Sequence, residues 1–196
     1  MPKGAATGAA LAFAALGGRA TLLSSLGTDP LAGLVRDDLE RHRAKVVDQA
    51  RGTTDVTVVL DAGSWKPVLT ELLPLTTMAV CASAFRLPGG EPSSASLIEQ
   101  GPEFVAVTDG PNAVRRCTRR RAGVVPVPTV TVRDSLGAGD TFHGAFAHAL
   151  ALGATPEDAL RSAVEIASMR VTNVGPRSWM SDPRLTTTTP PGAAAR

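Results

Sequence analysis

The sequence predicts an α/β protein in which a parallel sheet is flanked by helices. Short β-branched runs alternate along the chain with segments of helical periodicity, the pattern typical of βαβ units. A glycine-rich turn, Gly137-Ala138-Gly139, joins one such run to an amphipathic segment. The chain has 196 residues, 43% of them hydrophobic, enough for one domain with a substantial core. We therefore expect a single domain over residues 1–185 and a disordered tail over 186–196, rich in threonine, proline and alanine.

Each element of the first half follows from periodicity and from its flanking glycines or prolines. Helices are indicated by apolar residues three and four positions apart, and strands by short β-branched runs. The predicted elements are, in order, a helix over Ala5–Leu16, a strand over Ala20–Leu26, an amphipathic helix over Leu31–Arg43, a strand over Val56–Leu60 and a short helix from Trp65 or Pro67 to Leu73.

The second half continues the alternation and ends in two helices. Thr155 precedes Pro156 and Glu157, which is typical of a capped helix start. The predicted elements are strands over Met78–Cys81, Phe104–Thr108 and Val127–Val132, a helix over Ser94–Gln100, a helix from the glycine turn to Leu150, and a helix over Ala154–Val171.

Charge and composition do not indicate nucleic-acid or membrane binding. The formal net charge is +2, and the cluster of five arginines between Arg115 and Arg121 has no interleaved aromatic residues for base stacking, so a solvated loop or hairpin is expected there. The apolar stretch Ala5–Leu16 is shorter than a membrane span and has no cleavage site after it. Cys81 and Cys117 lack metal-site spacing. We expect a cytoplasmic protein that binds neither nucleic acid nor membrane.

The turn at Gly137–Gly139 has the chemistry of phosphate binding. The first N–H groups of a helix lack intrahelical partners and carry partial positive charge, so they stabilise a phosphate, and small side chains leave the approach open. Asp140, at the mouth of this helix, could take a proton from an acceptor hydroxyl. The alternative is that Asp140 only caps the helix and the glycines only form a tight turn.

A longer string around this turn resembles a known signature. Residues 134–146, Asp-Ser-Leu-Gly-Ala-Gly-Asp-Thr-Phe-His-Gly-Ala-Phe, resemble the C-terminal signature of ribokinase-like sugar kinases, the phosphofructokinase B family. The resemblance implies a ribokinase-like fold, with an anion hole at Gly137, Ala138 and Gly139 and a catalytic base at Asp140. It also implies that Asp134 helps to hold a monovalent cation, as the equivalent acidic residue does in some members.

The resemblance also nominates nucleotide contacts at two further places. Thr108-Asp109-Gly110 follows a predicted strand and is similar to a family segment that lies against ATP, which implies Thr108 and Gly110 as contacts; a plain strand-to-turn exit is the alternative. The segment from Val171 to Ser178 resembles one that closes over the adenine and offers backbone oxygens to the cation, which implies Asn173 and Gly175 as participants; otherwise it is only a helix end.

The chain also departs from the family pattern. The usual N-terminal strand and its sugar-binding aspartate are not found, and Gly8 stands where an asparagine is expected. The lid sheet is largely missing, with a deletion junction near 53–56, so the chain looks shortened and internally deleted. The segment after Met78–Cys81 lacks the Asn-x-x-Glu motif that organises water around magnesium, although the nucleotide phosphates supply most magnesium ligands.

Two hypotheses follow from the agreement and the departures. The first is an ATP-dependent kinase that phosphorylates a sugar or nucleoside hydroxyl, with ATP and Mg²⁺, and K⁺ as a further cofactor implied by the resemblance. The second is a catalytically inactive remnant that binds nucleotide or a protein partner, since a missing lid would leave the site open to water. Relatives often dimerise through the lid, so the resemblance allows a homodimer.

Overall fold

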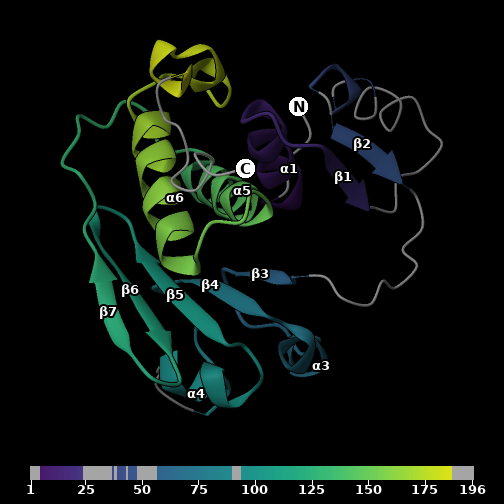
Figure 1. Cartoon of the computed structure of the whole chain (residues 1–196), viewed down its shortest axis with the longest axis vertical. Helices are drawn as coiled ribbons and strands as arrows, with labels where there is room; N and C mark the ends of the chain where they lie inside the picture. The colour runs from purple at the N-terminus through teal and green to yellow at the C-terminus, as the bar shows by residue number, and fades with distance from the viewer. Residues whose placement is uncertain are drawn as a thin grey trace. The chain divides into compact units, whose positions relative to one another are not determined.

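The structure of the chain is a computed structural model that describes residues 5–23, 37, 39–42, 44–47, 57–89 and 94–186 (Figure 1). The contacts divide it into two compact units, one of Met1–Gly52 with Val130–Arg196 and the other of Thr53–Thr129. The boundary between them falls beside the junction predicted at 53–56. That both units form a single domain stays a prediction, and the predicted tail lies outside the described residues except for Thr186.

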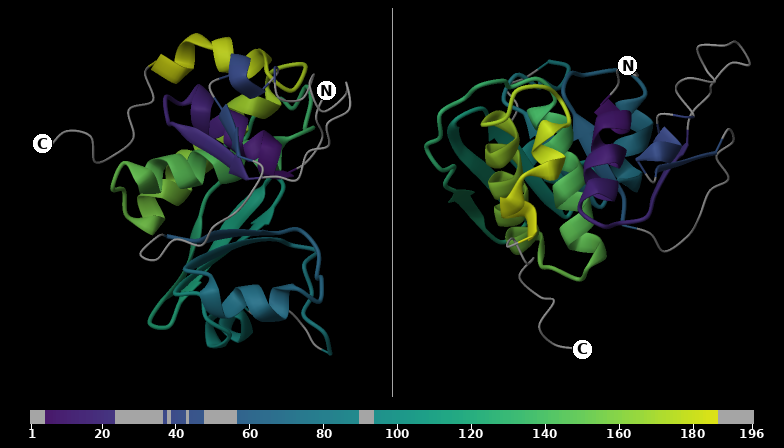
Figure 2. Two further views of the ribbon diagram at one scale, coloured as in Figure 1. Left: turned by 90° about the vertical axis from the view of Figure 1, so that its right-hand side faces the viewer. Right: turned by 90° about the horizontal axis from the view of Figure 1, so that it is seen from above.

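The first unit is built on three helices that pack side by side, α1 (Ala5–Ala15), α5 (Ala138–Ala151) and α6 (Pro156–Val171) (Figure 2). Next to α1 lies a parallel pair of strands, β1 (Ala20–Leu23) and β2 (Ala44–Val47). Two short 3₁₀ turns, Ser178–Ser181 and Pro183–Thr186, follow α6. The helix predicted over Ala5–Leu16 and the strand predicted from Ala20 are thereby confirmed.

Helices α1 and α5 run parallel and approach each other closely at Gly144. A Cβ atom added at Gly144 would lie 2.3 Å from the carbonyl oxygen of Ala9 and 2.6 Å from the Cβ of Ala12. One turn further along both helices, the rings of Phe13 and His148 meet edge to face with centroids 5.3 Å apart. Because no side chain separates the backbones at Gly144, the helices hold each other in a defined register.

Helix α6 runs back along α5, so that its C-terminal end lies beside the N-terminal end of α5. The N–H groups of Arg133 and Asp134, just before α5, donate to the carbonyl oxygen of Val171 at the end of α6. Thr155 caps α6 as predicted, because its hydroxyl accepts the N–H of Asp158 at 3.2 Å. The hydrogen bonds of Arg133 and Asp134 with Val171 join the residues before the glycine turn to the end of α6.

The second unit contains a five-stranded mixed sheet in the order β3-β4-β5-β6-β7. Three strands are parallel, β3 (Val59–Ala62), β4 (Met78–Ala82) and β5 (Phe104–Asp109), and the two that complete the sheet are antiparallel, β6 (Asn112–Thr118) and β7 (Ala122–Val125). Two short helices belong to the unit, α3 (Leu69–Leu72), which continues into a 3₁₀ turn over Leu73–Leu75, and α4 (Ser94–Glu99).

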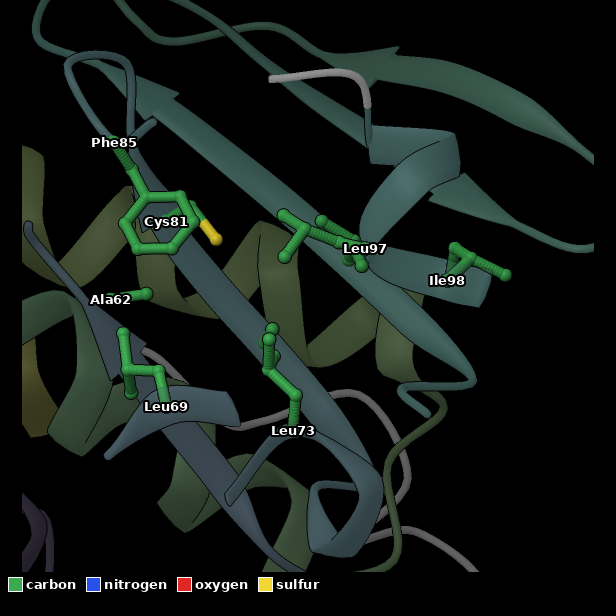
Figure 3. Packing of buried hydrophobic residues seen from close by; sticks show 9 residues of the cluster. Ala62, Leu69, Leu73, Cys81, Phe85, Leu97 and Ile98 are labelled. Carbon is green, nitrogen blue, oxygen red and sulfur yellow. The ribbon is translucent and has the colours of Figure 1, made fainter. Parts of the chain in front are cut away.

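The core of this unit lies between the sheet and its short helices (Figure 3). Leu69 and Leu73 from α3 and the following turn, and Leu97 and Ile98 from α4, pack against side chains of the strands. The strand residues in the cluster are Ala62, Ala79, Cys81 and Val105, and Phe85 closes it from the loop after β4. Burial of these apolar side chains is the main stabilising term for the unit.

Some predicted elements differ from the structure. The strand predicted over Val127–Val132 is wrong, because the segment has no regular secondary structure. Pro126 and Pro128 have no N–H to donate to a ladder, which explains why β7 ends at Val125. The predicted parallel sheet is present in β3, β4 and β5, and the antiparallel strands β6 and β7 extend it. The hairpin expected around the arginine cluster is confirmed, and most of the helix predicted over Leu31–Arg43 lies outside the described residues.

None of the helices in the described ranges has the length and apolar character needed to cross a membrane.

Candidate active site

The glycine turn opens α5 in the way that the sequence predicts. Gly137 is the N-cap residue with φ of 78°, a left-handed conformation that strongly favours glycine, and as a glycine it makes no side-chain cap hydrogen bond of its own. Asp140 is the third residue of α5, not its N-cap. The N-cap position itself is thus held by Gly137, and both the catalytic role of Asp140 and the alternative in which it only supports the helix start stay predictions.

The space in front of this helix end is open. A Cβ atom added at Gly139 would have no neighbour within 4 Å, and one added at Gly137 would meet only the Asp140 carboxylate, at 3.9 Å. Open space beside the first amides of a helix is what a phosphate group needs, because the N–H groups and the helix dipole both favour an anion there. Gly137 and Gly139 thus leave room for an anion, and anion binding at Gly137, Ala138 and Gly139 stays a prediction.

The Asp140 carboxylate packs against the backbone of α1. A Cβ atom added at Gly8 would lie 2.3 Å from Asp140 Oδ2 and 2.5 Å from its Cβ, so this glycine makes room for the side chain. One turn into α5, the buried His143 donates from Nδ1 to the carbonyl oxygen of Gly139 at 2.8 Å. Both contacts fix the first turn of α5.

Asp134 is the centre of a hydrogen-bond network just before the turn. Its Oδ1 accepts the N–H of Leu136 at 2.9 Å, and its Oδ2 accepts the N–H of Gly175 at 2.9 Å. Oδ2 also pairs with Arg170 at 3.2 Å. The N–H groups of Leu136 and Gly175, together with the Arg170 guanidinium, hold the pKa of Asp134 below its ordinary value, so the side chain is a carboxylate at neutral pH.

Arg170, on the last turn of α6, is fully buried with 0% exposure. Its guanidinium donates to the backbone oxygens of Asp134 at 3.2 Å and Asn173 at 3.0 Å, and to that of Leu136. With the Asp134 carboxylate, it therefore has four oxygen partners from both sides of the α5–α6 junction. Only its Nε has no hydrogen-bond partner among the described residues.

The segment after α6 is fixed by its own polar contacts. The Asn173 amide donates to the carbonyl oxygen of Met169 at 3.1 Å and to Asp182 Oδ2 at 3.2 Å, and Asp182 pairs with Arg184 at 2.6 Å. Gly175 has φ of 87°, so a side chain there would be strained. The segment after α6 is held further by Trp179, which is fully buried and donates from Nε1 to the Pro176 carbonyl oxygen at 3.2 Å.

Thr108 and Gly110 belong to the second unit. Thr108, on β5, donates from its hydroxyl to the Cys81 carbonyl oxygen at 3.3 Å, and Gly110 has φ of 54° in the two-residue turn between β5 and β6. Gly110 and Pro111 thus form the turn of a hairpin, and Asp109 at the end of β5 pairs with Asn112 at the start of β6. Their contact with a nucleotide stays a prediction.

The structure brings most of the predicted residues together within the first unit. Gly137, Ala138, Gly139 and Asp140 open α5, and the Arg170 network links Asp134 to Asn173 and Gly175. Sequence reasoning missed Arg170 and the role of Gly8. A signal for Arg170 was present, because it continues the buried stripe of α6 through Ala159, Ala163 and Ile166, where an arginine needs partners.

A metal ion at Asp134 does not fit this arrangement. Both carboxylate oxygens already accept hydrogen bonds, and the guanidinium takes up the neighbouring backbone oxygens. No group of three or more His, Cys, Asp or Glu side chains suited to a metal occurs in the described part of the chain.

Comparison with known proteins agrees with this geometry. The pfkB family carbohydrate kinase profile matches residues 43–183. Ribokinase of Bacillus subtilis (strain 168) is 39% identical over 79 residues, which cover 40% of this chain and 27% of that protein. The matched part therefore spans about a quarter of this curated relative.

Solved structures show the same fold. A ribokinase from Thermotoga maritima has a TM-score of 0.74 at 19% identity, with 91% of this chain and 84% of that chain covered. Arabidopsis thaliana ribokinase, complexed with ribose and ATP, has a TM-score of 0.74 at 20% identity, with 95% and 88% covered. These likenesses define a ribokinase-like α/β fold. The profile match, which covers more than half of the chain, further shows that the chain belongs to the pfkB family of carbohydrate kinases.

Proposed function

We propose that the chain is an ATP-dependent sugar kinase that transfers the γ-phosphate of ATP to a hydroxyl group of a sugar or nucleoside. The observation that carries this proposal is the start of α5, where a carboxylate at the third helical position stands beside a glycine-lined helix end. Membership of the pfkB family and the ribokinase and deoxyribokinase names of relatives support the same reaction class.

Asp140 acts as the general base in this proposal. Its carboxylate accepts the proton of the acceptor hydroxyl as the oxygen attacks phosphorus, which makes the oxygen a better nucleophile. The contact with Gly8 holds the side chain in place, so little freedom is lost when the acceptor binds. Gly137, Ala138 and Gly139 present backbone N–H groups to the equatorial oxygens of the transferring group, where negative charge must be stabilised.

Nucleotide binding in this proposal involves the turn after β5 and the segment after α6. Thr108 and Gly110 lie against the nucleotide in this proposal, and Asn173 and Gly175 line its adenine side through their backbone. ATP supplies the transferable phosphoryl group, and Mg²⁺ neutralises its charge. A sugar acceptor, a cytoplasmic location and a homodimer are further expectations from the sequence.

The test is ADP release from MgATP with a panel of sugars and nucleosides, for the chain and for its Asp140→Asn variant. Asparagine keeps the size of the side chain but cannot accept the proton, so sugar-dependent turnover should fall about 10²–10⁴-fold. Glu165→Gln, at an exposed position on α6, removes a carboxylate elsewhere and should leave turnover unchanged.

Each outcome separates the two hypotheses. Sugar-dependent turnover that is lost in the Asp140→Asn variant establishes the kinase. A folded chain that binds MgATP, measured by calorimetry, but shows no turnover with any acceptor contradicts the kinase and supports the nucleotide-binding remnant. Equal turnover of both proteins would overturn the assignment of Asp140 as base.

A further inference from the structure

We propose that the guanidinium of Arg170 permanently occupies the position at which a monovalent cation would bind beside Asp134, so that the chain needs no K⁺ or Na⁺. The resemblance implies a cation held by Asp134 and by backbone oxygens after α6. In the structure, these groups surround an arginine side chain from α6 instead. The inference deepens the proposed kinase function, yet its main test does not depend on activity.

The environment of the guanidinium is that of a cation site. Three backbone oxygens, from Asp134, Leu136 and Asn173, and one carboxylate oxygen accept its hydrogen bonds. Such a set of oxygens, with a single negative charge, is the ligand type that alkali cations prefer. The guanidinium also brings one positive charge, so it meets the same electrostatic need.

A second cation has no room in this network. Both Asp134 carboxylate oxygens are engaged, Oδ1 by the Leu136 N–H and Oδ2 by the Gly175 N–H and Arg170. An added K⁺ would have to displace a buried, hydrogen-bonded guanidinium or lie next to its positive charge. Both arrangements are unfavourable, since removal of one partner leaves the other charge buried and unpaired.

Arg170 is in this way a positioning residue for the anion-binding turn. Its guanidinium connects the backbone of Asp134 and Leu136, directly before Gly137, with Asn173 on the segment after α6. The hydrogen bonds of its guanidinium described above go to Asp134, Leu136 and Asn173. A loosened network would therefore shift the amides of the turn and act on phosphate binding more than on proton transfer by Asp140.

The experiment measures thermal melting and MgATP binding in KCl, NaCl and choline chloride at equal ionic strength. For the unaltered chain, the Tm and the Kd for MgATP should be the same in all three salts, because no alkali ion is bound. A Tm or an affinity that rises in KCl relative to choline chloride would overturn the inference, whether or not the chain is an active kinase.

The Arg170→Ala variant tests the position directly. Loss of the guanidinium should lower the Tm on the order of 10 °C and weaken MgATP binding, and KCl should restore part of both losses where choline chloride does not. Arg161→Ala, on the exposed face of the same helix, removes only a surface pair with Glu157 and should change neither quantity measurably.

A conservative variant covers the case in which Arg170→Ala does not fold. Lysine keeps the positive charge with fewer donors, so Arg170→Lys should melt below the unaltered chain yet stay insensitive to KCl. An Arg170→Ala protein that folds and shows no response to KCl would contradict the proposal that this is a cation position. Failure of kinase turnover alone would affect the proposed function and leave the melting results intact.

Discussion

Gly8 on α1 leaves the space that the Asp140 carboxylate fills. A Cβ atom at position 8 would lie 2.3 Å from Oδ2, so Gly8→Ala must push the carboxylate aside. Displacement of a catalytic group by about 1 Å costs about 100-fold in rate, and we expect kcat for sugar phosphorylation to fall by this order while the chain stays folded. The measurement is steady-state ADP release, with a melting curve as the check on folding.

The matched control for this residue is Gly63→Ala. A Cβ atom there meets nothing within 4 Å, and the position lies in the other unit, so the same chemical change should leave kcat unaltered. If Gly8→Ala retains full kcat, Asp140 is not held by this contact or is not the base. The Asp140→Asn result separates these two explanations.

At the scale of elements, the parallel pair α1 and α5 depends on a glycine at its contact. A methyl group at Gly144 would lie 2.3 Å from the Ala9 carbonyl oxygen and would force the helices apart. Gly144→Ala should therefore lower the free energy of unfolding by about 1–3 kcal/mol, measured by urea denaturation. Gly139→Ala, on the same helix and facing open space, should not destabilise the chain, because alanine favours helix.

The sequence predicted those elements whose signals are local, and it could not predict contacts that depend on the packing of two helices. Periodicity and capping predicted α5, α6 and the Thr155 cap, since these signals are local. The strand over Val127–Val132 was wrong because β-branched composition outweighed two prolines in that prediction. The contact of Gly8 with Asp140 could not be predicted from the sequence, because it joins residues far apart in the chain through the packing of two helices.

For the whole molecule, the two units provide separate reporters of unfolding. Cys81 in β4 is buried in the core of the second unit, and burial, with a smaller contribution from Asp61, raises the pKa of its thiol to about 12. Relative to the ordinary value of 9.0, the reactive thiolate is about a thousandfold rarer. At pH 8, a thiol reagent should thus label Cys81 only after this unit opens, whereas the partly exposed Cys117 should react in the folded chain.

Trp179 reports the first unit, because it is fully buried after α6. In a Cys117→Ser, Trp65→Phe variant, Cys81 labelling and Trp179 fluorescence can be followed in the same urea series. Since the Cys81 cluster lies wholly within the second unit, we expect two different midpoints. Coincident midpoints would show that the chain unfolds as one cooperative body.

The Arg170 guanidinium is part of the chain, whereas a metal ion in the same position would be exchangeable, and the two respond differently to the salt in the solution. A bound ion exchanges with the medium, and its occupancy follows the concentration of that ion. A side chain has no dissociation equilibrium with the solution, so its occupancy is independent of electrolyte composition. In the proposal made for Arg170, the chain is therefore not regulated by the ratio of potassium to sodium, and the order of the turn at Gly137–Gly139 does not depend on a bound ion.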